Sequence, residues 1–305
     1  MIPKHLFEII RRIEITTSRM VTDVFAGEYH SVFKGRGMEF NEVREYSFGD
    51  DIRTIDWNVT ARTGIAHVKK YVEERELTVM ILVDLSRSCQ FGSVRELKAK
   101  LAAEIAAVLA FCATRNNDKV GLILFTDRIE KFIPPRKGLI HVLRLIREAL
   151  YFVPKGSATD LPVALDYLNR VTARKTVSFI VSDFLVNPAA GQTKPSTMAE
   201  TWQKALRLAN KRHDLVAVTL NDPREKGLPP CGLIELRDAE TERMILVDSS
   251  DPGVRRRYEE EARRRIVQRE TLFGIVGMDH IDVSTDLSYA KEMVKFFTRR
   301  KKRFR

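Results

Sequence analysis

The stretch TVMILVDLSRSCQFG, residues 78–92, decides the fold class of this chain. It begins as an apolar run rich in β-branched residues, which is typical of a fully buried strand. It then changes abruptly to Asp84, Ser86 and Ser88, so that oxygen-bearing side chains occupy every second position. This pattern fits a polar turn at the edge of a core, and it also fits one part of a metal site.

Strand-like and helix-like segments alternate from about residue 77 onward. We expect strands at 77–83, 119–125, 128–133, 176–181, 215–220 and 280–283, and helices at 96–115, 139–152, 161–171, 198–212 and 287–297. This alternation predicts an α/β fold, doubly wound, with a mainly parallel sheet and helices on both faces.

The first 75 residues have a different pattern. A helix is expected over 3–25, followed by short strands and loops rich in Gly, Thr and Tyr that pack on the larger domain. Residues 76–305 then form the α/β domain, which an atypical hairpin and charged helix interrupt at 222–265. The sequence therefore predicts a large domain with a small N-terminal region.

Composition and cysteine usage limit the class of protein. No apolar run approaches the roughly 20 residues that a transmembrane helix needs, and the N-terminus lacks a secretory signal core. The three cysteines, Cys89, Cys112 and Cys231, are odd in number and widely spaced, which argues against a disulfide framework and against a zinc site. Cys112 lies on the apolar face of a helix and is interpreted as a core residue. A cytoplasmic protein without a transmembrane segment is expected.

The formal net charge of +11 raises the question of a nucleic-acid partner. Six of the last seven residues are basic, and we interpret this run as a solvated tail. Binding of the tail to nucleic acid or to an anionic lipid surface is an alternative, but a nucleic-acid partner is not expected.

Topology brings the polar ends of two strands together. If strand 77–83 is central, the strands at 119–125 and 176–181 lie on either side of it, and ligands bind at the carboxyl ends where the strand order reverses. Asp183 follows strand 176–181, and Thr159 lies in the preceding loop. Oxygen ligands suit a hard divalent cation. The candidate ligands are Asp84, Ser86, Ser88, Thr159 and Asp183.

The order D-x-S-x-S, then Thr, then Asp resembles the metal-ion-dependent adhesion site (MIDAS) of von Willebrand factor type A domains. The resemblance implies that the serines and the threonine ligate the cation directly or through water, and that the aspartates act largely through water. It also implies that an acidic side chain of a protein partner completes the shell. Mg²⁺ is the expected cation, with Mn²⁺ and Ca²⁺ as alternatives, and no organic cofactor is expected.

The N-terminal region carries a second resemblance. The stretch KGRGMEFNEVREYSFGDDIRTIDWNVTARTG at 34–64 and the segment 67–84 resemble domain-of-unknown-function family 58, a bacterial family that joins such a region to a type A domain. Its members are often encoded beside MoxR-type AAA+ ATPases. The carboxylates and arginines of this stretch are interpreted as structural groups that fix a loop, in preference to a second metal site. The signature residues are Arg36, Asp50, Asp51, Arg53, Asp56, Trp57 and Arg62.

Two main functions remain open. The first is a non-enzymatic, metal-dependent protein-binding module that acts with a MoxR-type AAA+ ATPase, or with a client of one, in chaperoning or assembly. The second is a metal-dependent phosphoester hydrolase that uses Asp84 or Asp183, with Arg87 stabilising the transition state. No general base and no G-x-S-x-G motif are evident in the sequence, which favours the binding module.

Overall fold

The computed structural model describes residues 29, 32, 39–72, 76–94, 96–185, 195–239 and 242–303. The chain divides into two compact units, one of Phe33–Leu77 and one of Met1–Val32 with Thr78–Arg305. The helix expected over 3–25 lies outside the described residues. Within the described ranges, every helix is too short or too polar to cross a lipid bilayer.

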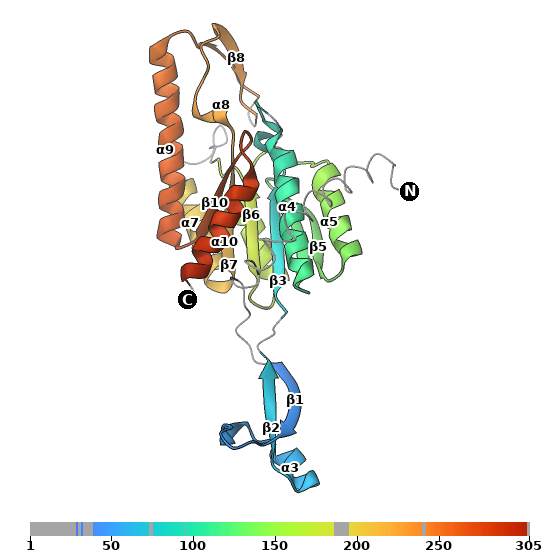
Figure 1. Cartoon of the computed structure of the whole chain (residues 1–305). Coiled ribbons are helices and arrows are strands. Elements are labelled where there is room, and N and C mark those ends of the chain that lie inside the picture. The colour runs from blue at the N-terminus through green and yellow to red at the C-terminus, as the bar shows by residue number, and fades with distance from the viewer. Residues whose placement is uncertain are drawn as a thin grey trace. The chain divides into compact units, whose positions relative to one another are not determined.

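The smaller unit is built on an antiparallel strand pair. Strand β1 (Glu39–Glu45) pairs with β2 (His67–Val72), and the connection between them contains the 3₁₀ helix η2 (Ile52–Thr54) and helix α3 (Trp57–Thr63) (Figure 1). Helix α3 ends at Gly64, whose φ of 75° lies in the left-handed region that glycine adopts without strain.

Three signature carboxylates hold the turns of this unit. Asp50 Oδ1 lies 2.6 Å from the Arg44 guanidinium, and Asp51 accepts the Arg53 N–H at the start of η2. Asp56 accepts the N–H groups of the first turn of α3, and its other oxygen lies 3.4 Å from Lys69 Nζ. Trp57 is two-thirds exposed, and Arg36 lies outside the described residues.

The larger unit contains a six-stranded sheet with the order β10-β7-β6-β3-β4-β5. All neighbouring strands are parallel except β5, which runs antiparallel to β4. The strands are β3 (Thr78–Asp84), β4 (Lys119–Phe125), β5 (Ile129–Arg136), β6 (Val177–Ser182), β7 (Asp214–Asn221) and β10 (Asp279–Ser284). Strand β3 is central, with β4 on one side and β6 on the other, which confirms the predicted α/β fold.

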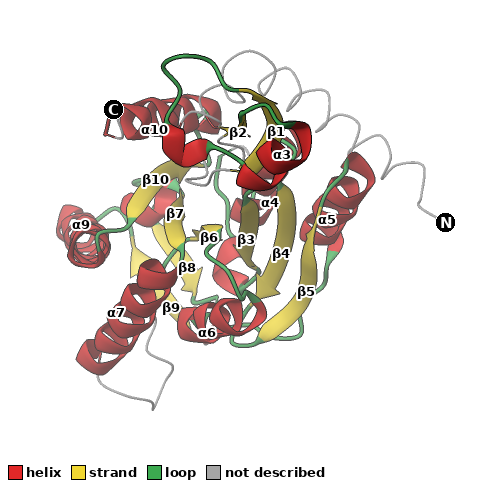
Figure 2. Cartoon of the chain, turned by 90° about the horizontal axis from the view of Figure 1, so that it is seen from below, coloured by secondary structure: helices red, strands yellow, loops and turns green. Residues whose placement is uncertain are grey.

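Helices cover both faces of this sheet. Figure 2 shows α4, α5 and α10 on one face and α6 and α7 on the other, with α9 beside α7. Their bounds are α4 (Lys98–Arg115), α5 (Leu139–Tyr151), α6 (Leu161–Val171), α7 (Pro195–Arg212), α9 (Pro252–Val276) and α10 (Tyr289–Arg303). Helix α4 is rich in alanine and almost entirely buried, because small side chains let it lie close to the central strands.

The segment between β7 and β10 adds a hairpin to the sheet unit. Helix α8 (Pro223–Lys226) is followed by the antiparallel strands β8 (Leu233–Arg237) and β9 (Met244–Asp248), and then by α9. Asp251 caps the N-terminus of α9 by accepting the Gly253 N–H, as expected for an Asp-Pro-Gly start.

The basic C-terminal run is only in part the solvated tail that composition predicts: Arg299, Lys302 and Arg303 are exposed, but Arg300 is buried. Helix α10 continues to Arg303, and the Arg300 side chain is almost completely buried, where its guanidinium pairs with Asp214 and Asp279 at the starts of β7 and β10. Arg300 follows the buried Phe296 and Phe297 on the same helical face, so its alkyl stem continues the apolar stripe and its charge meets two carboxylates.

Candidate metal centre

Strand β3 ends on a completely buried carboxylate. Asp84 Oδ1 accepts the Ser86 N–H at 2.9 Å, and Oδ2 accepts the Ser182 hydroxyl at 2.6 Å. The first bond closes a tight turn directly after the strand, and the second ties β3 to its neighbour β6. The sequence D-x-S therefore fixes the local backbone before any ligand is considered.

The two serines of the same loop present their hydroxyls to one another. Ser86 and Ser88 are both buried, and their Oγ atoms lie 2.9 Å apart at the start of the 3₁₀ helix η3 (Arg87–Gln90). The Arg87 N–H donates to the Ser157 carbonyl at 3.0 Å, which joins this loop to the one that carries Thr159. Thr159 is also buried. The first and second candidate loops are thus held together by backbone hydrogen bonding.

Asp183 enters from the end of β6. Its Oδ1 accepts the Leu185 N–H at 3.1 Å, and the following Phe184 adopts a φ of 52°, unusual for a side chain of that size. Potential ligand atoms of Asp84, Asp183 and Cys89 all lie within 4.8 Å of one another. The ends of β3 and β6 therefore converge as the parallel topology predicts.

A residue that the sequence analysis did not select completes this cluster. Lys98, the first residue of α4, is completely buried, and its Nζ lies 2.7 Å from Asp183 Oδ2 and 2.5 Å from Glu225 Oε1. A signal for it was present, because Lys98 occupies the apolar stripe of α4 with Leu101, Ala102 and Ile105. A lysine in such a stripe needs a buried partner of opposite charge.

Burial and like charge shift the pKa of several groups here. Burial, together with the charge of Asp183, raises the pKa of Asp84 to about 6. Burial also raises the pKa of Glu225. For Lys98, burial lowers the pKa, but the charges of Asp183 and Glu225 outweigh it and hold the pKa above its ordinary value. Burial and the charge of Asp84 raise the pKa of the Cys89 thiol well above its usual range.

These donors suit a hard cation. The carboxylates and hydroxyls supply oxygen, the ligand atom that Mg²⁺ and other hard cations prefer, and the Cys89 thiol is the one sulfur group among them. Each aspartate oxygen accepts one hydrogen bond and keeps acceptor capacity, and the Ser86 and Ser88 hydroxyls, which face one another, can also offer oxygen to a cation. Three carboxylates lie against the Lys98 ammonium and the Arg269 guanidinium, so the cluster keeps a net negative charge that a cation would offset.

Two arginines connect the site to the segment between β7 and β10. Arg269 of α9 donates to the Asp183 carbonyl at 3.2 Å and to Asn221 Oδ1 at 3.0 Å. Arg87, which lies between the two candidate serines, pairs with Glu242 in the turn of the β8–β9 hairpin. Glu242 also lies 3.2 Å from Arg237, so the hairpin turn is anchored beside the candidate metal loop.

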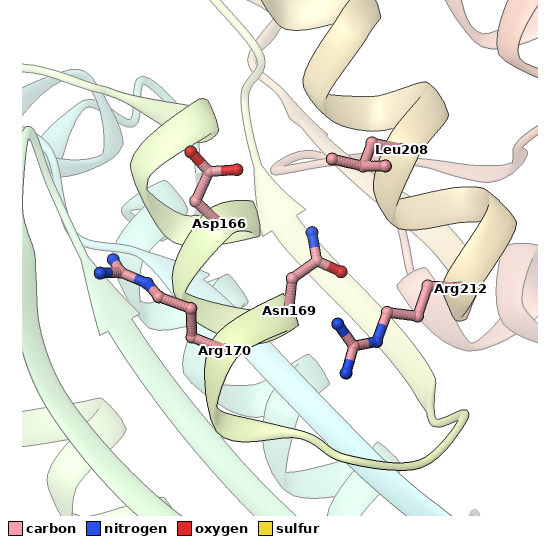
Figure 3. Close-up of a pocket in the computed structure, with 5 residues that line it drawn as sticks. All are labelled: Asp166, Asn169, Arg170, Leu208 and Arg212. Carbon is pink, nitrogen blue, oxygen red and sulfur yellow. The ribbon is translucent and has the colours of Figure 1, made fainter.

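A pocket of about 460 Å³ lies elsewhere on the sheet unit. Figure 3 shows that its lining side chains come from α6 and α7; they are Asp166, Asn169, Arg170, Leu208 and Arg212. Asn169, Arg170 and Arg212 lie in the last turns of α6 and α7, and these helices lead into the amino ends of β6 and β7. The pocket is therefore remote from the candidate metal centre and contains none of the five expected ligands.

The comparisons with known proteins identify a family. The family model described as "Protein of unknown function DUF58" matches residues 42–268. The uncharacterized protein Rv1480 of Mycobacterium tuberculosis is 31% identical over 296 residues, which cover 96% of this chain and 89% of the relative.

Solved structures show limited similarity in shape. BatB from Bacteroides thetaiotaomicron is 16% identical with a TM-score of 0.44, over 74% of this chain and 99% of that one. A von Willebrand factor type A structure from Catenulispora acidiphila is 10% identical with a TM-score of 0.39. The match covers 78% of this chain and 44% of that chain. The family assignment rests on sequence: this chain belongs to the family of proteins described as DUF58.

Proposed function

We propose that this chain is a non-enzymatic protein-binding module of the cytoplasm. It holds a divalent cation, preferably Mg²⁺, and recruits a protein partner through that cation. The observation that supports the proposal best is the convergence of four buried oxygen-bearing side chains at the carboxyl ends of two adjacent strands. They are Asp84, Ser86, Ser88 and Asp183, with Thr159 on the neighbouring loop.

The surplus negative charge of the site supports a cation. The pKa of Asp84 is raised to about 6, which indicates that its ionised form is disfavoured while no cation balances it. Neutral hydroxyls contribute little charge, so we expect the affinity for Mg²⁺ alone to be modest. A carboxylate from a partner would then raise the affinity, which makes cation binding and partner binding mutually dependent.

The surroundings of the site favour binding over hydrolysis. A metal-dependent phosphoester hydrolase gains from a cationic side chain that, together with its metal ion, stabilises the transition state. Arg87, the residue best placed in sequence for that role, is paired with Glu242 of the hairpin. When bound, the cation would supply a positive centre that an acidic side chain of a partner can reach.

The family resemblance indicates which partner to test first. A MoxR-type AAA+ ATPase, or a protein on which such an ATPase acts, is the first candidate, and the role would be chaperoning or assembly of a protein complex. The chemistry of the site requires only that the partner present an Asp or Glu on an accessible surface.

Capture experiments in Mg²⁺ and in EDTA test the proposal. The full chain is immobilised and its partners are captured from the native host, with a Ser86→Ala/Ser88→Ala variant beside it and the exposed Ser250→Ala as a matched control. We expect partners to be retained in Mg²⁺ and lost both in EDTA and in the double variant. EDTA-sensitive capture that survives in the double variant would contradict the proposal. Phosphatase turnover that Asp183→Ala abolishes would favour the hydrolase.

A further inference from the structure

We infer that Lys98 is a built-in cation that competes with the metal ion for Asp183, and that Glu225 is the group that retains the ammonium when a metal ion enters. This inference rests on the proposed function, since it concerns how the same site is controlled. It assigns a role to two residues that lie outside the set of five expected ligands.

The first support is the position of the Lys98 ammonium. The side chain is completely buried, and the two carboxylates it contacts are Asp183, at 2.7 Å, and Glu225, at 2.5 Å. A buried ammonium must stay paired, because leaving water without a counter-charge is strongly unfavourable. Lys98 can therefore give up Asp183 only if Glu225 still holds it.

The second support is that both oxygens of Asp183 are already engaged, one of them by the ammonium. Its Oδ1 accepts the Leu185 N–H at 3.1 Å, and its Oδ2 accepts the Lys98 ammonium. A cation, or a water that a cation holds, would approach the same carboxylate and would lie close to a like charge. Full use of Asp183 by a metal ion therefore requires the ammonium to move away from Oδ2.

The third support is that Glu225 is fixed in place independently of Lys98. Its Oε2 accepts the Asp222 N–H at 3.1 Å, which forms one half of a capping box at α8. Asp222 in turn accepts the Ser93 N–H at 2.9 Å and the Thr285 hydroxyl at 2.6 Å. Glu225 is thus held against the sheet unit by contacts that do not involve the metal centre.

The competition has a definite consequence for affinity. While the ammonium stays between the two carboxylates, Asp183 is partly neutralised and the metal ion binds weakly. Glu225 offsets this effect, because it stabilises the position of the ammonium in which Asp183 is free. Glu225 of α8 therefore controls the affinity of the metal centre for a cation by holding the Lys98 ammonium.

A double-mutant cycle on metal binding tests the inference. Mn²⁺ serves as the probe, and its affinity for the full chain is measured by electron paramagnetic resonance and by calorimetry with Mg²⁺ in competition. The variants are Lys98→Met, Glu225→Gln and their combination. The control is Lys100→Met, since Lys100 lies on the same helix with an exposed ammonium paired with Glu96. A cooperative thermal unfolding transition is required of each variant, because it shows that the variant is folded.

We expect Lys98→Met to raise the affinity for Mn²⁺ by about 5- to 100-fold, the range typical of coupling between two competing ligands. Glu225→Gln should lower the affinity in the presence of Lys98 and have little effect in the Lys98→Met background. A general loss of negative charge would instead lower the affinity equally in both backgrounds. Equal affinities of Lys98→Met and Lys100→Met would overturn the inference. If Lys98→Met does not fold, the cycle uses Lys98→Gln, which removes the charge and leaves a polar group for Asp183 and Glu225.

The outcomes also separate the inference from the proposed function. If Lys98→Met gains affinity but no partner is captured in Mg²⁺, the competition stands and the protein-binding role fails. If the wild-type chain and every variant fail to bind Mn²⁺, both are overturned.

Discussion

The Nζ atom of Lys98 lies 2.7 Å from Asp183 Oδ2, and neither side chain is more than 1% exposed. This pair places an ammonium beside the cluster of Asp84, Asp183 and Cys89, which includes both carboxylates of the proposed cation site. Replacement of one member of such a pair leaves an uncompensated buried charge, which is costly. We therefore expect that substitutions of the charged groups in this cluster change the stability of the fold and the affinity for a cation in opposite directions.

Replacement of Asp84 by asparagine should stabilise the fold and remove cation binding. The folded-state pKa of Asp84, about 6, lies above the ordinary value, so its ionised form costs free energy at pH 7.5. We expect Asp84→Asn to raise the free energy of unfolding in urea by about 1–3 kcal/mol at pH 7.5. Between about pH 4 and 6 the folded wild-type chain binds the extra proton, so the difference should shrink as the pH falls toward 4.

The exposed Asp166→Asn is the control, and it should leave stability within about 0.5 kcal/mol of the wild type. Added Mg²⁺ should stabilise the wild-type chain and leave Asp84→Asn unchanged. A variant that is less stable than the wild type at pH 7.5 would show that the hydrogen bonds of Asp84 outweigh its charge.

Arg300→Ala should destabilise the sheet unit. Arg300 is 5% exposed and bridges Asp214 and Asp279, which are partly exposed. Its loss leaves two neighbouring carboxylates without a shared counter-charge, and we expect about 2–3 kcal/mol less stability in urea unfolding. Lys302→Ala, an exposed change two residues later, should have almost no effect. Equal effects of the two variants would restore the interpretation of this run as a solvated tail.

The sequence is sufficient for the centre of the sheet, where β4 and β6 lie on either side of β3, and for the convergence of Asp84 and Asp183. The apolar runs of β3 and β6 show that both strands are buried, and parallel topology places their carboxyl ends at one edge. Each of these inferences needs only the hydrophobic pattern of a few consecutive residues and the general rule that parallel strands end at the same edge of a sheet.

The partners of Lys98 and Arg300 could not be predicted in this way. Glu225 is 127 residues away from Lys98 in sequence and lies on a four-residue helix that has no periodic pattern. Asp214 is 86 residues away from Arg300, and composition alone made the basic run resemble a tail. Pairing across such separations depends on how the elements pack, so sequence shows the need for a partner without showing which residue provides it.

Stability should fall in acid because of His213. This side chain is 1% exposed beside Thr172 and Thr176, and burial lowers its pKa to about 4. The unfolded chain takes up the proton below about pH 6.5 and the folded chain does so only near pH 4, so stability is lost as the pH falls between these values. The expected loss is up to about 3 kcal/mol.

Because Asp84 has the opposite pH dependence between about pH 4 and 6, the measurement is made in the Asp84→Asn background. Urea unfolding is followed from pH 7.5 to pH 4.5 with and without His213→Asn. The added substitution should flatten the pH profile. An unchanged slope would show that His213 does not control the acid sensitivity.

Removal of the Cys89 thiol should leave cation binding intact. Cys89 Sγ lies within 4.8 Å of ligand atoms of Asp84 and Asp183, so geometry alone would permit a thiolate ligand. Burial and the charge of Asp84 raise the pKa of this thiol, however, so a metal ion would have to displace the thiol proton before the sulfur could bind it. We therefore expect Cys89→Ala to bind Mn²⁺ with an affinity within about twofold of the wild type, since hard cations prefer oxygen.

In the folded chain a thiol reagent should modify the exposed Cys231 and spare the buried Cys89 and Cys112 until denaturant is added. A large loss of metal affinity in Cys89→Ala, together with rapid modification of Cys89, would indicate a thiolate ligand and a softer metal ion at the end of β3.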